Sequence, residues 1–456
     1  MKKIDLSQGN IYKVLLLFAL PLMLGSLIQQ LYVTVDAAIV GQCIGKNGLA
    51  AIDSVHTLFR FPINFMNGMS AGVTILISKY FGARDKDGVV NSIRTACLIS
   101  VVLGVMVSLL GVAFTPSFLR ALSVPETIYG KADTYTRIYF AGMVTMILYN
   151  MFAAILRAVG DTRRPLYVLA ACAVFNIIGD YIMIVRMGMG VAGAALATVI
   201  AQGISAFIVI YIVIKEIWLD ASPQKTYLKV DLHCLWHMLK IGMPLAIQSM
   251  LFPIANTIVQ ASVNTLGTNE IAAWGLCDKA DMLIWLIADS MGPALTTYVA
   301  QNIGAGKMDR VKRGVRSGTL LSVLGVGLVS LTLYIGMDVI GTWFLTPKDA
   351  VIVVPLATGY MKIMAGFFIF YAVGEALSGA CCSMGNTVIP MVVTMVSMCM
   401  LRMLAIWFVF PNFLSMECVV WIYIASWMAS AISFFIMYEI RLHQPFSCTL
   451  ADTSLQ

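Results

Sequence analysis

Long uncharged stretches recur along this chain and restrict what it can fold into. The first, "VLLLFALPLMLGSLIQQ", covers residues 14–30 without one charged side chain, and similar stretches follow it to the end of the sequence. A helix needs about 20 apolar residues to cross the hydrocarbon core of a bilayer. Backbone groups in lipid must be hydrogen-bonded within a closed structure, and the ~10-residue alternation of a membrane β-strand is absent. We therefore expect an all-α integral membrane protein.

Twelve transmembrane helices can be placed on the sequence. Only 12% of the residues are charged, against about 25% in soluble domains. We expect the spans to centre near residues 25, 63, 104, 145, 176, 202, 250, 286, 325, 367, 399 and 429. If the amino terminus is cytoplasmic, basic residues are nearly threefold more frequent on the cytoplasmic side than outside, as the positive-inside rule requires. An even number of spans then places both termini in the cytoplasm.

The two halves of the sequence repeat each other. "TILISKYFGARDKDGVVNSIRTA" at residues 74–96 matches "TTYVAQNIGAGKMDRVKRGVRSG" at residues 296–318, and "AVGDTRRP" matches "SMGNTVIP" further along. Each half holds six spans, so the halves are parallel repeats, which is a transporter architecture with sites near the middle of the membrane. We expect a first six-helix lobe over residues 1–214, a cytoplasmic linker over 215–234 and a second six-helix lobe over 235–456.

Polar side chains inside the spans of the first half form one candidate site. Asp36 lies in the first span, where a carboxylate costs roughly 2.5 to 3.5 kcal/mol at mid-depth and ionisable residues usually serve function. Asn176 and Asp180 share one helix face, and Thr198 lies in the next span. Two buried carboxylates cannot both be ionised cheaply, so one should bind and release a proton. The same oxygen atoms suit Na⁺, and a purely structural hydrogen-bonded network is the alternative.

The second half does not copy these residues, because the repeat places apolar side chains opposite both carboxylates and the amide. It carries instead four polar residues in its own spans: Gln248, Asp289, Tyr371 and Glu375. These are candidates for contacts with a substrate or for a second coupling site. A structural pairing of Glu375 with Arg402 or Lys279 is the alternative.

Five motifs occur in a fixed order along the chain. They are "LPLMLGSLIQQLYVTVDAAIVG", "ISKYFGARD", "ILRAVGDTRRP", "NIIGDYIMI" and "GVAGAALATVIAQ". Together they resemble the multidrug and toxic compound extrusion (MATE) family of prokaryotic type, and the resemblance runs from about residue 10 to residue 443. It implies two six-helix lobes around a central cavity in a bacterial inner membrane, and export of cationic amphiphiles in exchange for H⁺ or Na⁺ by alternating access.

The same resemblance assigns roles to individual residues. It implies that Asp36, Asn176, Asp180 and Thr198 form a cation site in the first lobe. Sodium-coupled members also carry a tyrosine and an acid on the tenth helix, which Tyr371 and Glu375 match, and a glutamate on the seventh helix, where this chain has Gln248.

Other functions fit the sequence less well. "GMSAG" at residues 68–72 matches the G-x-S-x-G of serine hydrolases, but it lies within an apolar span, where its glycines form a G-x-x-x-G packing pattern. No Walker loop or zinc motif occurs. We expect no enzyme activity, catalytic residue or cofactor, and no metal unless Na⁺ is the coupling ion. A lipid-linked or oligosaccharide flippase of the same superfamily is the alternative. The expected partners are organic cations and the bilayer, without nucleic acid, and the expected state is a monomer.

Overall fold

The structure is a computed structural model that describes residues 4–218 and 231–443. Contacts divide the chain into two compact units. The first unit contains residues 20–246 together with the segment that precedes residue 6, and the second contains residues 6–19 and the chain from residue 247 onward. The predicted linker, 215–234, overlaps residues 219–230, which lie outside the described residues, so the predicted lobe boundaries stay a prediction.

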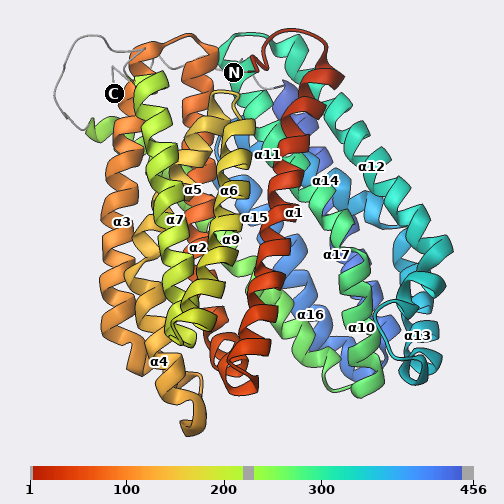
Figure 1. Cartoon of the computed structure of the whole chain (residues 1–456). Helices are drawn as coiled ribbons and strands as arrows, with labels where there is room; N and C mark the ends of the chain where they lie inside the picture. The colour runs from red at the N-terminus through yellow and green to blue at the C-terminus, as the bar shows by residue number, and fades with distance from the viewer. Residues whose placement is uncertain (1–3, 219–230, 444–456) are drawn as a thin grey trace. The chain divides into compact units, whose positions relative to one another are not determined.

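Helices make up both units (Figure 1). Those that begin before the gap are α1 (Ile11–Cys43), α2 (Lys46–Gly82), α3 (Lys86–Ala121), α4 (Glu126–Ala141), α5 (Met143–Ala158), α6 (Arg163–Asp180) with the π-helix η1 (Tyr181–Arg186), and α7 (Val191–Val213) with the π-helix η2 (Ile214–Trp218). Those that follow it are α9 (Leu232–Val263), α10 (Thr268–Ala280), α11 (Met282–Gly304), α12 (Met308–Thr342), α13 (Pro347–Ala365), α14 (Phe368–Ser383), α15 (Val388–Thr394), the π-helix η3 (Met395–Met400), α16 (Leu401–Phe408), the 3-10 helix η4 (Phe410–Asn412) and α17 (Met416–His443).

The predicted membrane spans correspond to these helices. Within the described residues, nine helices are long and apolar enough to cross a membrane, and two bent pairs, α4–α5 at 43° and α13–α14 at 51°, raise the number to eleven. The remaining predicted span corresponds to α2, a helix of 37 residues that contains Asn64 and Asn67. Every predicted centre falls in a helix or, at residue 367, at the bend between α13 and α14. The predicted all-helical membrane fold is confirmed.

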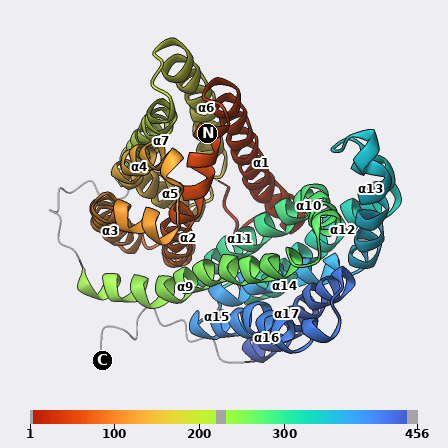
Figure 2. The same ribbon diagram turned by 90° about the horizontal axis from the view of Figure 1, so that it is seen from below.

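The internal repeat is visible in the helix order. Three helices of the first unit, α5, α6 and α7, begin at Met143, Arg163 and Val191. Their counterparts α14, α15 and α17 each begin 225 residues later, at Phe368, Val388 and Met416. In the first unit α5 packs against α7, and in the second unit their counterparts α14 and α17 pack against each other (Figure 2). These three helices of the second unit therefore follow those of the first in the same order and at a constant spacing of 225 residues.

Gly68 and Gly72 form a packing face on α2. A Cβ atom at Gly68 would lie 2.4 Å from the Cα atom of Ala246, and one at Gly72 would lie 2.5 Å from the Cα atom of Gly242. Both partners belong to the part of α9 that is in the first unit. The predicted G-x-x-x-G packing is confirmed, and the motif lies inside a helix rather than at a strand–turn–helix elbow.

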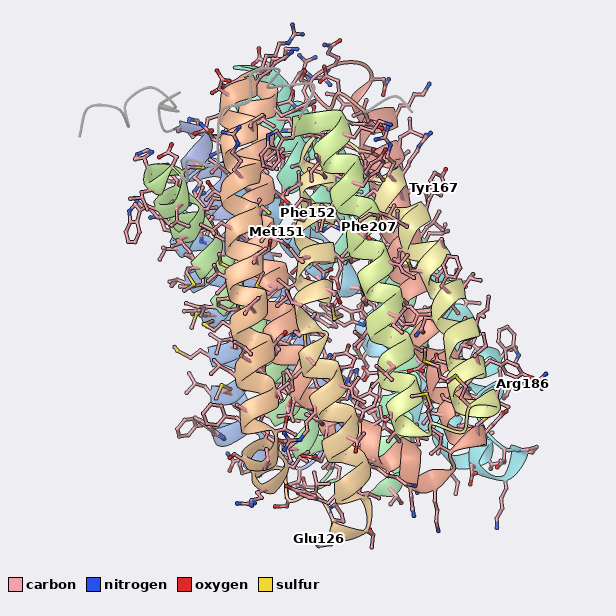
Figure 3. The ribbon with its side chains drawn as sticks, turned by 60° about the vertical axis from the view of Figure 1, so that its left-hand side comes forward. Glu126, Met151, Phe152, Tyr167, Arg186 and Phe207 are labelled. Carbon is pink, nitrogen blue, oxygen red and sulfur yellow. The ribbon has the colours of Figure 1, made fainter. Side chains whose placement is uncertain are left out.

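The outward faces of the helices are apolar. In the first unit, Tyr167 on α6 and Phe207 on α7 are 55% and 73% exposed, and both point away from the helix bundle (Figure 3). In the same view Glu126 lies at the lower end, Arg186 lies in the lower part, and Tyr167 lies in the upper part. Large exposed apolar side chains between charged ends are what a bilayer requires.

Candidate cation site

The first unit brings together the four residues predicted to bind a cation. Asp36 on α1 and Asp180 at the end of α6 are close enough for their carboxyl groups to interact. One turn before Asp180, the amide nitrogen of Asn176 lies 3.4 Å from the hydroxyl oxygen of Thr198 on α7. Three helices thus direct oxygen-bearing side chains to one place, as the sequence predicted.

The site is rich in hydrogen-bond acceptors and poor in donors. Asp180 is 0% exposed and Asn176 is 3% exposed. Four buried oxygen atoms of these residues have no hydrogen-bond donor among the described residues: Oδ1 of Asp36, both carboxyl oxygens of Asp180, and Oδ1 of Asn176. The Thr198 hydroxyl donates its hydrogen to the carbonyl oxygen of Ala194 at 3.0 Å. A buried acceptor without a donor costs about 1–3 kcal/mol, so the arrangement favours a shared proton or a hard cation that oxygen atoms coordinate.

The backbone around Asp180 explains how the site is built. A Cβ atom at Gly179 would lie 3.1 Å from the Cβ atom of Ala197 on α7. The glycine therefore permits α6 and α7 to approach closely, which lets Asn176 reach Thr198. Directly after Asp180, α6 continues as the π-helix η1.

An aromatic cluster that was not predicted from the sequence accompanies the carboxylates. Asp36 interacts electrostatically with Tyr32, one turn earlier on α1, and with Tyr135 and Tyr139 on α4. The rings of Tyr135 and Tyr139 are stacked with centroids 5.8 Å apart. The ring centroid of Phe59 on α2 lies 4.1 Å from that of Tyr139. The one sequence signal is the spacing of the two tyrosines, which puts them on the same face of a helix. Aromatic faces beside carboxylates suit an organic cation.

The second unit contains a different polar group. The hydroxyl of Tyr371 on α14 donates a hydrogen bond of 2.7 Å to Oδ1 of Asp289 on α11. Glu375, one turn after Tyr371, interacts electrostatically with Asp289, and a Cβ atom at Gly292 would lie 3.7 Å from its Oε2 atom. Trp285 packs edge-on against Tyr371, with ring centroids 4.5 Å apart. Asp289 is exposed and Tyr371 is buried, so the acid is the accessible member of the pair.

Gln248 lies apart from this polar group. Its amide nitrogen donates to the hydroxyl of Thr394 on α15 at 3.1 Å. The suggested structural partners of Glu375 are also engaged elsewhere, because Arg402 donates to Ser426 and Lys279 lies over the ring of Phe344. The structure therefore groups three of the four candidates of the second half, and leaves out Gln248.

Comparison with known proteins agrees with this architecture. The probable multidrug resistance protein YoeA of Bacillus subtilis is 29% identical over 395 residues, which cover 85% of this chain and 84% of that protein. The probable multidrug resistance protein YpnP of the same organism is 27% identical over 402 residues, which cover 88% and 89%. A solved outward-facing multidrug resistance MATE family transporter of the MOP superfamily has the same fold, with a TM-score of 0.85 at 23% identity over 97% of this chain and 98% of that chain.

A family model decides the assignment. The MatE model matches the chain twice, over residues 21–182 and 244–408. Its two copies fall on the two halves that the sequence repeat defines, and together they cover more than half of the chain. This multi-pass membrane protein is therefore a member of the MatE (MATE) transporter family.

Proposed function

We propose that this protein is a secondary active efflux transporter that exports organic cations in exchange for H⁺ or Na⁺ by alternating access. The names of the two Bacillus subtilis relatives support a drug-like substrate. The observation that carries the coupling is the set of four buried acceptor oxygens without a donor in the first unit. A bound cation or proton removes the energetic cost of these unsatisfied acceptors, so occupancy of the site can be linked to the state of the transporter.

The carboxyl pair supplies the mechanism of coupling. With one proton between them, Asp36 and Asp180 can share it as a hydrogen bond, and α1, α6 and α7 can pack closely. Without that proton, two negative charges face each other in a buried place, and helix packing must loosen or a cation must enter. Asn176 and Thr198 add neutral oxygen atoms that would complete the coordination of Na⁺ if sodium is the coupling ion.

Substrate binding follows from the same charges. When the carboxyl pair is ionised, the site is negative and lies beside the rings of Tyr135 and Tyr139, so an organic cation gains both charge and ring contacts. When an external proton neutralises the pair, the cation loses its partner and leaves outward. Release of the proton to the cytoplasm then resets the site. Ion and substrate thus bias one equilibrium in opposite directions.

The second unit offers a further contact for the same cycle. Asp289, Tyr371 and Glu375 form an acidic group of their own, which would bind a substrate cation or a second coupling ion. The two carboxyl groups of this cluster can carry negative charge, which favours a cationic substrate over a lipid that bears a phosphate. The central cavity, the inner-membrane location, the cytoplasmic termini and the monomeric state belong to this proposal, as does the absence of enzyme activity and of any cofactor.

Flux measurements in proteoliposomes test the proposal. Ethidium serves as the organic cation, and a fluorescent phospholipid serves as the flippase substrate. Wild-type protein should move ethidium when a proton or sodium gradient is imposed, and Asp36→Asn should not. Asp133→Asn is the matched control, since Asp133 is a half-buried acid of the same unit that pairs with Arg137 at 2.8 Å. Movement of the lipid without ethidium flux would contradict the proposal and favour a flippase.

A further inference from the structure

Arg402 is a buried cation of the second unit that is held by neutral groups. The side chain is 1% exposed. Its Nε donates to the hydroxyl of Ser426 at 2.8 Å, its Nη1 donates to Oδ1 of Asn256 at 2.8 Å, and its Nη2 donates to the sulfur of Met398 at 3.6 Å. None of the ion pairs in the described ranges 4–218 and 231–443 involves Arg402. A charge in such a place usually has a function, because its burial is costly.

Aromatic rings complete the shell around this guanidinium. Its Cζ atom lies 4.1 Å from the ring centroid of Tyr423 and 5.7 Å from that of Phe252. The hydroxyl of Ser426 donates its own hydrogen to the carbonyl oxygen of Tyr423 at 2.7 Å, so its lone pairs face Arg402. An amide oxygen, a hydroxyl oxygen, a thioether and two ring faces together form a site for a cation.

The repeat places this shell where the first unit has its own cation site. The spacing of 225 residues between α6 and α15 aligns Arg402 with Ile177, next to Asn176. The same spacing between α7 and α17 aligns Tyr423 with Thr198. Asn256 lies on α9, which starts the second copy of the family model as α1 starts the first. The helix α9 thus corresponds to α1, the continuous run of α15, η3 and α16 corresponds to α6, and α17 corresponds to α7.

We propose that Arg402 is a tethered cation that permanently fills, in the second unit, the place that an exchangeable cation fills in the first. This inference rests on the proposed function for the role of the first-unit site. At the first-unit site the cation binds and dissociates during the cycle, and the packing of α1, α6 and α7 changes with its occupancy. In the second unit the cation is part of the chain, so α9, α16 and α17 keep one packing throughout the cycle. Arg402 is a positioning residue that confines ion-driven rearrangement to α1, α6 and α7.

Chemical rescue tests whether the shell is a cation site. Arg402→Ala removes the tether and leaves the oxygen atoms of Asn256 and Ser426 without their donor. Millimolar guanidinium chloride should then raise the Tm of this variant in detergent in a saturable way, by roughly 2 °C or more, relative to potassium chloride at equal ionic strength. Wild type should not respond. The control is Ile406→Ala, which empties a buried position one turn further along α16 without removing a charge. Equal responses of Arg402→Ala and Ile406→Ala, or no response of either, would overturn the inference.

Hydrogen–deuterium exchange of the wild type tests the consequence without any variant. A change of pH or of sodium concentration should alter exchange in peptides from α1, α6 and α7 and leave peptides from α9, α16 and α17 unchanged. Equal changes in both helix groups would overturn the tethered cation and leave the proposed coupling intact. No change in any helix would overturn the coupling and this inference with it. Arg402→Met, which fills the space without charge, should make exchange in α16 and α17 faster than in wild type, and unchanged exchange would contradict a positioning role.

Discussion

The amide nitrogen of Asn176 lies 3.4 Å from the hydroxyl oxygen of Thr198, while the amide oxygen of Asn176 has no donor among the described residues. This contact joins α6 to α7, and both carboxyl oxygens of Asp180, one turn further along α6, also have no donor among the described residues. Asp36 adds a second carboxyl group from α1. The site therefore depends on three helices and would change whenever one of them moves.

Asp180→Asn should abolish the response of export to an ion gradient. The amide keeps the size of the side chain and supplies donors of its own, so the site no longer needs a proton or a cation. Ethidium efflux from vesicles measures the effect, with Asp133→Asn as the control for loss of an acid elsewhere in the unit. Efflux by Asp180→Asn that still follows the imposed gradient would exclude Asp180 from coupling.

Substrate affinity should rise as pH rises. At low pH the carboxyl pair of Asp36 and Asp180 holds a proton and offers a cation no full negative partner, whereas at high pH the ionised pair does. Ethidium binding in detergent should tighten between about pH 5.5 and 8.5, within the roughly 5–150-fold range that is typical of coupled sites. The dependence should vanish in Asp36→Asn. Constant wild-type affinity over this range would refute competition with protons and favour Na⁺.

Tyr371→Phe should change ion dependence in addition to stability. The variant removes the 2.7 Å hydrogen bond to Asp289, and hydrogen bonds to charged groups contribute about 1.5–3 kcal/mol. Tyr360→Phe is the matched control, because Tyr360 is a buried tyrosine that donates to Glu270 between α13 and α10. Both variants should lower the Tm, and only Tyr371→Phe should alter the sodium or pH dependence of efflux. Parallel behaviour of the two variants would assign Asp289 and Tyr371 a structural role alone.

Gly72→Val should destabilise the first unit. A Cβ atom at this position would lie 2.5 Å from the backbone of Gly242, so α2 and α9 must separate, and overpacking of this kind costs about 1–3 kcal/mol. Gly130→Ala on α4 has nothing within 4 Å of the added atom and should be neutral or slightly stabilising. Thermal unfolding in detergent compares the two, and equal Tm values would contradict the close packing of α2 on α9.

Reporter fusions test the proposed orientation. Fusions at Lys86 and Lys312 should report the cytoplasm, and one at Lys348 should report the outside. Lys86 is the first residue of α3, Lys312 lies near the start of α12, and Lys348 is the second residue of α13, which follows α12 in the chain. An external signal at Lys86 or Lys312 would reverse the orientation and the direction of transport.

The sequence predicted the fold well because membrane helices depend on a signal that short segments carry themselves. A run of uncharged residues identifies a span wherever it lies, so the predicted centres agree with the helices. The bends were not predicted. The break between α4 and α5 occurs at Gly142, where a Cβ atom would lie 2.2 Å from Val199 on α7. That bend depends on packing between distant segments, which a single span does not reveal.

In the candidate site, too, the contacts within one helix could be predicted from the sequence, and the contacts between distant helices could not. Asn176 and Asp180 could be paired from their spacing, because four residues make one helical turn. The contact of Tyr371 with Asp289 could not, since its residues lie 82 positions apart on α14 and α11. Tyr135 and Tyr139 were missed because tyrosines are common in membrane helices, and only the fold shows that these two interact with Asp36.

If a cation bound by Asp36 and Asp180 drives export, ethidium transport must depend on an ion gradient and on Asp36. Ethidium flux is followed in proteoliposomes that contain wild type or Asp36→Asn, with either a proton gradient or a sodium gradient imposed and the other ion balanced. Wild type should transport ethidium against its own concentration gradient when one of the two ion gradients is imposed. This transport should stop when that ion gradient is dissipated. Asp36→Asn should respond to neither ion gradient. Uphill ethidium transport by Asp36→Asn at the wild-type rate, or wild-type flux that is independent of both gradients, would contradict coupling through Asp36 and Asp180.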